Sequence, residues 1–82
     1  MDIQDFKKYF SYKLCNYMLQ HGYTRETLAK KLGTSRQAVC CWLNGNRFPK
    51  LNILIKMSDI FGITVSEFLD FNEFTKERKT KK

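Results

Sequence analysis

The side chains with the greatest capacity for chemistry lie in one stretch, residues 34 to 50, which reads TSRQAVCCWLNGNRFPK. Cys40 and Cys41 are adjacent there, and thiolates can bind metals, form disulfides or respond to oxidants. Arg36 and Gln37 are also adjacent, and their forked side chains can form paired hydrogen bonds with guanine and adenine. The stretch therefore offers three alternatives: a thiol site, a metal site, or a surface that recognises hydrogen-bonding groups.

A metal site is the weakest of these alternatives. Apart from the adjacent pair, the chain contains one further cysteine, Cys15, and one histidine, His21. Structural zinc sites combine several cysteines and histidines at regular spacings, which this sequence lacks. An odd number of cysteines without a disulfide spacing indicates reduced thiols. We therefore expect no metal and no cofactor, and thiols that serve as small packing groups. Redox sensing is the alternative, because nearby arginines favour a thiolate.

The charge of the chain points to an anionic partner. Its 82 residues carry 15 basic and 8 acidic side chains, which gives a formal net charge of +7. Nucleic acid is the commonest partner of so basic a chain, and an acidic membrane surface is the alternative. No apolar run approaches the roughly 20 residues of a membrane span, and the N-terminal MDIQDFKK does not resemble a signal peptide. We expect a cytoplasmic protein that does not enter a membrane.

Helices must position these residues. Apolar side chains recur at spacings of three and four, and glycines interrupt the pattern. The pattern predicts helices over residues 5–20, 25–32, 36–43 and 51–61, and a fifth, short helix that follows Thr64 and runs through Phe71. The fold class is then all-α, a compact five-helix bundle over residues 1–71. The charged tail at 72–82 loses apolar content, and we expect it to be disordered.

Two of these helices are joined by a very short turn. Thr24 and Ser35 are suited to cap the helices that follow them, because a hydroxyl can accept an unpaired backbone N–H. Gly33 ends the second helix, and only Thr34 and Ser35 separate it from the third. Two helices joined by a turn of about three residues that contains glycine form the outline of a helix-turn-helix.

The run TRETLAKKLGTSRQAVCCWLNGNRFPKLNILIKMSDIFGITVSEFL resembles the helix-turn-helix of phage repressor and Cro proteins, the xenobiotic-response-element class of bacterial regulators. The matching positions, in order and spacing, are Thr24, Leu28-Ala29, Leu32-Gly33, Ser35-Arg36-Gln37, Val39, Trp42, Asn44-Gly45, Pro49, Leu51, Leu54 and Gly62-Ile63-Thr64. The resemblance implies a lambda-repressor-like fold. It also implies a sequence-specific transcriptional regulator, expected to be a repressor, that places the helix at 35–44 in the major groove of double-stranded DNA.

By this resemblance, the third helix carries the base-reading residues, which are Arg36, Gln37, Cys40 and Cys41. The residues expected at phosphates flank it on both sides: Thr24, Arg25, Ser35, Asn44, Asn46, Arg47 and Lys50. The charge agrees with this assignment, since residues 25–50 hold six basic residues and one acidic residue, Glu26, whereas residues 51–71 hold one lysine against three acidic residues. Trp42 and Val39 are expected to pack in the core.

The sequence departs from the family at two places. Members often bury an arginine near the end of the first helix against a glutamate in the third, and Met18 and Leu43 stand there instead. We expect these two side chains to touch as an apolar replacement of the pair. Lys50 occupies the usual N-cap of the fourth helix, so its start is in question.

Self-association is expected on DNA. One small helix-turn-helix covers few base pairs, so we expect a homodimer on two half-sites. Ile53 and Ile60 lie on one side of the fourth helix, and Ile60, Phe71 and Phe74 could form an apolar dimer patch. The alternative is that these residues close a small core.

A function of another class remains open. An antitoxin, or another protein-interaction module whose DNA binding is secondary, would need a segment for a toxin or antirepressor partner, and only residues 71–82 could serve. An enzyme is not expected, because no nucleophile stands beside a base and no carboxylates are paired at a plausible site.

Overall fold

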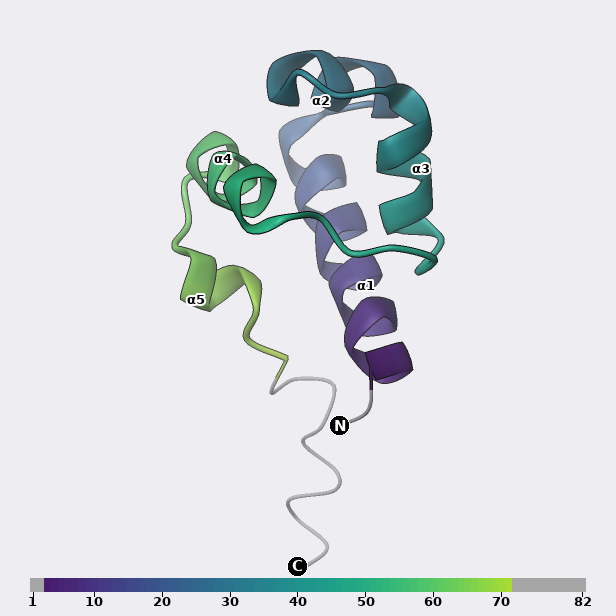
Figure 1. The fold of residues 1–82 in the computed structure, drawn as a ribbon. Helices are drawn as coiled ribbons and strands as arrows, with labels where there is room; N and C mark the ends of the chain where they lie inside the picture. Colours follow the sequence, from purple (N-terminus) through teal and green to yellow (C-terminus); the bar gives the residue numbers. More distant parts are fainter. Residues whose placement is uncertain (1–2, 72–82) are drawn as a thin grey trace, which may run out of the picture.

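The computed structural model describes residues 3–71, which fold into helices without any strand. The helices are α1 (Ile3–His21), α2 (Arg25–Leu32), α3 (Arg36–Leu43), α4 (Leu51–Phe61) and α5 (Val65–Phe68). Figure 1 shows α1 as the long helix in the middle, with α2 across its C-terminal end, α3 on one side, and α4 and α5 on the other. The predicted all-α fold is confirmed, and α2, α3 and α4 have the predicted bounds.

Hydroxyl caps and a left-handed glycine set the bounds of α2 and α3. Thr24 accepts a hydrogen bond from the Thr27 N–H, and the Thr27 hydroxyl accepts one from the Thr24 N–H, which completes a capping box. Gly33 has φ 72°, a conformation that side chains disfavour, and Thr34 N–H closes the end of α2 by donating to the Ala29 carbonyl at 3.0 Å. Ser35 then caps α3 by accepting from the Ala38 N–H. Both predicted caps are confirmed.

The core lies where α1 meets the shorter helices. Within residues 3–71 its buried apolar side chains are Phe10, Leu14, Met18, Leu28, Ala29, Leu32, Val39, Trp42, Leu54, Met57, Phe61, Phe68 and Phe71. Trp42 is only 6% exposed, as predicted from its place in the third helix. Ser11 ties α1 to the end of α3, because its buried hydroxyl donates to the Trp42 carbonyl at 2.6 Å or to the Lys7 carbonyl at 2.9 Å.

The fifth helix is shorter than predicted, since α5 ends at Phe68 and not at Phe71. Two features explain the early end. Lys13 on α1 donates to the backbone carbonyls of Glu67 and Asp70, at 2.7 and 2.9 Å, where a continued helix would use such carbonyls itself. The chain then turns inward, and Phe71 packs against Phe6 with their ring centroids 5.1 Å apart.

The predicted dimer patch is wrong for Phe71, which is 5% exposed and belongs to the core. Ile53 and Ile60 are half-buried and pack against the same core. Phe71 therefore closes the small core, which is the alternative given above, and a dimer contact of Ile53 and Ile60 stays a prediction. Phe74 and the tail at 72–82, including its predicted disorder and the segment offered for a toxin, lie outside the described residues.

The two departures from the family pattern have simple structural outcomes. Lys50 stands at the N-cap of α4 without a side-chain capping bond. Met18 is buried and Leu43 is half-buried, and both line one open hollow of about 380 Å³ between α1 and the start of α2. Their direct contact stays a prediction. No helix within residues 3–71 is long and apolar enough to span a membrane.

Candidate nucleic-acid interface

The core anchors α3 by one face and leaves the start of the helix exposed. Val39 is fully buried and Trp42 nearly so, whereas Arg36 and Gln37 are exposed in the first turn. Ser35 caps this turn through its hydroxyl, 3.1 Å from the Ala38 N–H. The cap and the buried pair fix the direction of the first turn, so Arg36 and Gln37 emerge from a rigid part of the molecule.

A hollow beside α3 brings together residues from both predicted classes. It has a volume of about 230 Å³ and is lined by Ser35, Gln37, Ala38, Cys41 and Arg47. Gln37 and Cys41 were predicted to face bases, and Ser35 and Arg47 to face phosphates. Arg47 follows α3 in the chain, and its backbone N–H donates to the Cys41 carbonyl at 3.4 Å. The segment after α3 therefore folds back beside the exposed face of the helix.

The remaining predicted phosphate residues are exposed, and they are Thr24, Arg25, Asn44, Asn46 and Lys50. Thr24 and Arg25 stand at the start of α2, where the positive end of the helix dipole favours an anion. Cys40 is half-buried and does not line the hollow of Gln37 and Cys41. The grouping of Cys40 with the base-reading residues thus has less geometric support than that of Cys41.

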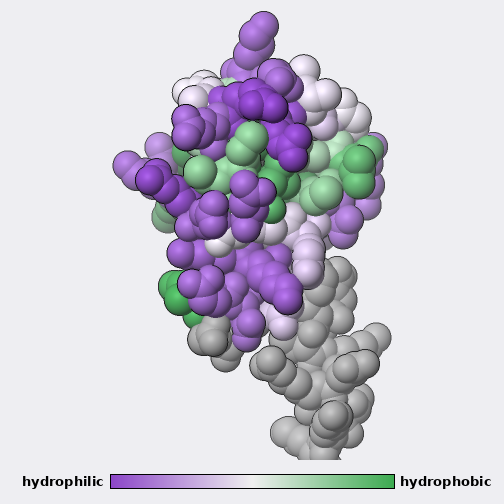
Figure 2. Space-filling view, turned by 90° about the vertical axis from the view of Figure 1, so that its right-hand side faces the viewer, coloured by the Kyte–Doolittle hydropathy of each residue, from purple (hydrophilic) through white to green (hydrophobic). Residues whose placement is uncertain are grey.

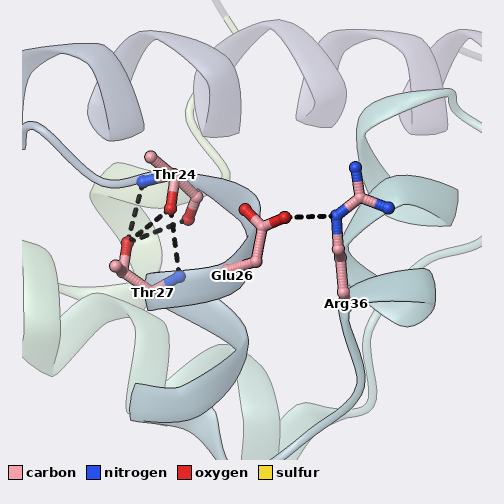
Figure 3. A network of polar contacts seen from close by, with 4 residues as sticks. All are labelled: Thr24, Glu26, Thr27 and Arg36. Carbon is pink, nitrogen blue, oxygen red and sulfur yellow. Dashed lines mark hydrogen bonds and ion pairs between the residues drawn. The ribbon is translucent and has the colours of Figure 1, made fainter.

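Sequence reasoning missed an ion pair among these exposed residues. Glu26 on α2 and Arg36 on α3 form a salt bridge, with the carboxylate Oε2 2.7 Å from the guanidinium Nε. Figure 3 shows the two side chains meeting across the gap between the helices. Both side chains remain more than half exposed, at 62% and 57%. A signal for it was present, since Glu26 is the sole acidic residue between positions 25 and 50.

The carboxylate of Glu26 is held in its ionised form. Its pKa lies below the ordinary value of 4.5, because its own backbone N–H and the charge of Arg36 favour the anion, although desolvation acts in the opposite direction. The Thr24 hydroxyl also favours the anion. Glu26 is therefore charged at neutral pH, as its ion pair with Arg36 requires.

Known proteins match both the sequence and the fold. The family model described as Helix-turn-helix, HTH_3, matches residues 16–68. The chain belongs to this family. An HTH-type transcriptional regulator of Methanocaldococcus jannaschii, MJ0272, itself uncharacterised, is 34% identical over 61 residues, which cover 74% of this chain and 92% of that protein. The crystal structure of a hypothetical transcription factor from Neisseria, NHTF, has a TM-score of 0.74 at 23% identity, over 85% of this chain and 80% of that one.

Membership confirms the function class predicted from the sequence. As a member of the helix-turn-helix family, the chain is a DNA-binding transcriptional regulator and not an enzyme. The likeness to the Neisseria protein confirms the fold. The family model includes the turn, α3 and α4, so the predicted DNA-binding residues all lie within the matched range.

The surface of this family member agrees in character with its function. Figure 2 views the side of the molecule on which α3 lies in Figure 1, and hydrophilic residues surround a band of apolar residues that crosses its upper half. The three cysteines are free thiols, with Cys15 exposed and the other two half-buried. Within residues 3–71 no three His, Cys, Asp or Glu side chains gather as metal ligands would. Whether the thiols are inert stays a prediction.

Proposed function

We propose that this helix-turn-helix protein recognises a specific double-stranded DNA sequence by placing the start of α3 in the major groove. One observation carries the proposal: the Ser35 cap and the buried Val39 and Trp42 leave Arg36 and Gln37 exposed together on a rigid first turn. Arginine recognises guanine and glutamine recognises adenine through paired hydrogen bonds. Cys41 adds a small side chain beside Gln37, and Cys40 completes the proposed base-reading set.

The phosphate contacts are proposed on both sides of α3. Thr24 and Arg25 at the start of α2 would hold one phosphate, with help from the positive end of the helix dipole. Ser35, Asn44, Asn46, Arg47 and Lys50 would hold others. Such contacts set the position of the protein on DNA but carry no sequence information. The formal charge of +7 supports this division, because it favours binding to any duplex.

We further propose that the protein acts as a homodimer and as a repressor. A single α3 covers few base pairs, and two copies on half-sites about 10–10.5 base pairs apart supply more affinity and specificity. A dimer across a promoter would block other proteins from the same groove, which favours repression over activation. The place of action would be the cytoplasm, where the DNA of a bacterium or an archaeon lies.

Selection from a random duplex pool tests the proposal. The full chain is incubated with the pool, and bound duplexes are recovered and sequenced over several rounds. We expect one enriched motif with two related halves at a spacing of about one helical turn. Retention of DNA without enrichment of any sequence would refute specific recognition, and enrichment of a single half with one protein bound would refute the dimer.

A further inference from the structure

Glu26 is out of place on a surface that binds DNA. It stands among six basic residues between positions 25 and 50, and it is 62% exposed. A carboxylate near phosphates weakens binding to every duplex, because like charges repel. A carboxylate that lowers the affinity for every duplex should have some other role at this position. Its contact with Arg36 indicates what that role is.

The geometry of the pair leaves the recognition groups of Arg36 free. Glu26 contacts the guanidinium through Nε, at 2.7 Å, and not through the terminal nitrogens. Figure 3 shows these terminal nitrogens pointing away from Glu26. Within residues 3–71, Glu26 is the charged partner that the structure records for Arg36. The contact thus holds the plane of the guanidinium while its outer edge stays open to a ligand.

We propose that Glu26 is a positioning residue that sets the base preference of Arg36. The proposal rests on the proposed function of α3. A held guanidinium presents two parallel N–H donors that match O6 and N7 of guanine. An unheld arginine is free to turn toward a phosphate, which gives affinity without sequence information. Glu26 keeps Arg36 from that alternative, and its repulsion of phosphates weakens non-specific binding at the same time.

These two effects predict that binding to specific and to scrambled duplexes changes by different amounts when Glu26 loses its charge. Binding to a scrambled duplex should strengthen, since one negative charge leaves the surface. Binding to the preferred site should gain less or weaken, since Arg36 is no longer held. The ratio of the two dissociation constants is therefore the quantity that reports the positioning role. A purely structural role of Glu26 in the first turn of α2 would change the melting temperature but not this ratio.

The chain offers matched control variants. Glu26→Gln keeps the shape of the side chain and removes its charge, and Glu26→Asp keeps a carboxylate at the start of α2 but shortens its reach. Asp59→Asn changes the net charge by the same amount at an exposed position of α4, outside the proposed interface. Arg36→Ala, alone and combined with Glu26→Gln, shows whether Glu26 acts through Arg36.

Dissociation constants of the full-length variants are measured on three duplexes: the selected site, the same site with the preferred guanine replaced, and a scrambled sequence. We expect Glu26→Gln and Glu26→Asp to lower the preference for the guanine about tenfold, within the range that a bidentate arginine contact supplies. Asp59→Asn should leave that preference unchanged, and Glu26→Gln should have no further effect on it in the Arg36→Ala background.

The outcomes separate the two proposals. If the wild-type chain selects no sequence, the proposed function fails before Glu26 is tested. If the wild type discriminates and Glu26→Gln strengthens binding to all three duplexes equally, Glu26 merely repels DNA and the inference is overturned. A loss of preference that persists in the Arg36→Ala background overturns it as well, because Glu26 would then act without Arg36.

Discussion

Two helix pairs of this molecule are joined by turns of the same geometry, and they differ in the side chains that they expose. In α2–α3, Gly33 has φ 72° and ψ 34°, and a hydroxyl cap, Ser35, follows two residues later. In α4–α5, Gly62 has φ 71° and ψ 33°, and Thr64 caps the next helix at the same distance. The equivalent closing hydrogen bonds measure 3.0 Å, from Thr34 N–H, and 2.9 Å, from the Ile63 N–H.

The two pairs carry charges of opposite sign. Residues 25–50 hold six basic residues and one acidic residue, whereas residues 51–71 hold one basic and three acidic. The first turn of α3 presents Arg36 and Gln37, and that of α5 presents Val65 and Ser66. The backbone of a helix-turn-helix is therefore a common way to join two helices. In the proposed function, DNA binding depends on the side chains at the start of the second helix.

Replacement of the buried aromatic residue that holds the second helix of each pair should have the largest effect on stability, and the effect should be similar in the two pairs. Trp42 anchors α3 and Phe68 anchors α5, and they are 6% and 0% exposed. Replacement of either by alanine leaves a large cavity, and we expect each to lower the free energy of unfolding by about 3–5 kcal/mol. Urea denaturation followed by circular dichroism measures this. A Phe68→Ala variant as stable as the wild type would show that α5 is not part of the cooperative fold.

Replacement of two buried serines should have smaller effects on stability, and the two effects should differ. Ser11 donates between elements, from α1 to the Trp42 carbonyl, whereas Ser58 donates within α4, to the Leu54 carbonyl at 2.8 Å. We expect Ser11→Ala to cost about 1 kcal/mol, because the Trp42 carbonyl still accepts from the Gly45 N–H. Ser58→Ala should cost less, since such bonds back to a helix carbonyl add little. Equal costs in urea denaturation would contradict the role of Ser11 in holding α3.

The smallest expected effect is on DNA affinity, and it concerns an exposed position of α5. Ser66 is exposed in the first turn of α5, at the place that Gln37 holds in α3. An added charge there lies outside the proposed interface, and salt screens exposed charges beyond about 8 Å at physiological ionic strength. We expect Ser66→Arg to change the affinity for the selected site by less than about twofold. A large gain on specific and scrambled duplexes alike would show that α5 also lies against DNA.

Local signals in the sequence predicted most of this fold. Thr24, Ser35 and Gly33 act on the few residues beside them, so their roles could be inferred from the sequence without knowledge of the packing. Trp42 was expected in the core because buried aromatic side chains dominate small cores. The proposed contacts of Gln37 and Arg47 with DNA follow from the family resemblance and from their residue types, and they await measurement.

The features that were missed depend on contacts between distant segments. The end of α5 depends on Lys13, more than 50 residues earlier in the chain, and on the burial of Phe71 against Phe6. The pair of Glu26 and Arg36 depends on how closely α2 packs on α3. Neither an apolar spacing nor a capping pattern reports such distances, so the sequence indicated an unusual Glu26 without indicating its partner.

The central claim is that Arg36 reads a base while Arg47 only contacts the backbone of DNA. Dissociation constants of Arg36→Ala and Arg47→Ala on the selected and a scrambled duplex, at several salt concentrations, test it most directly. We predict that Arg36→Ala loses about 1–3 kcal/mol on the selected site and relaxes the preference at one base step. Arg47→Ala should weaken both duplexes alike and lower the salt slope by about one unit. An equal loss on both duplexes for Arg36→Ala would contradict the account.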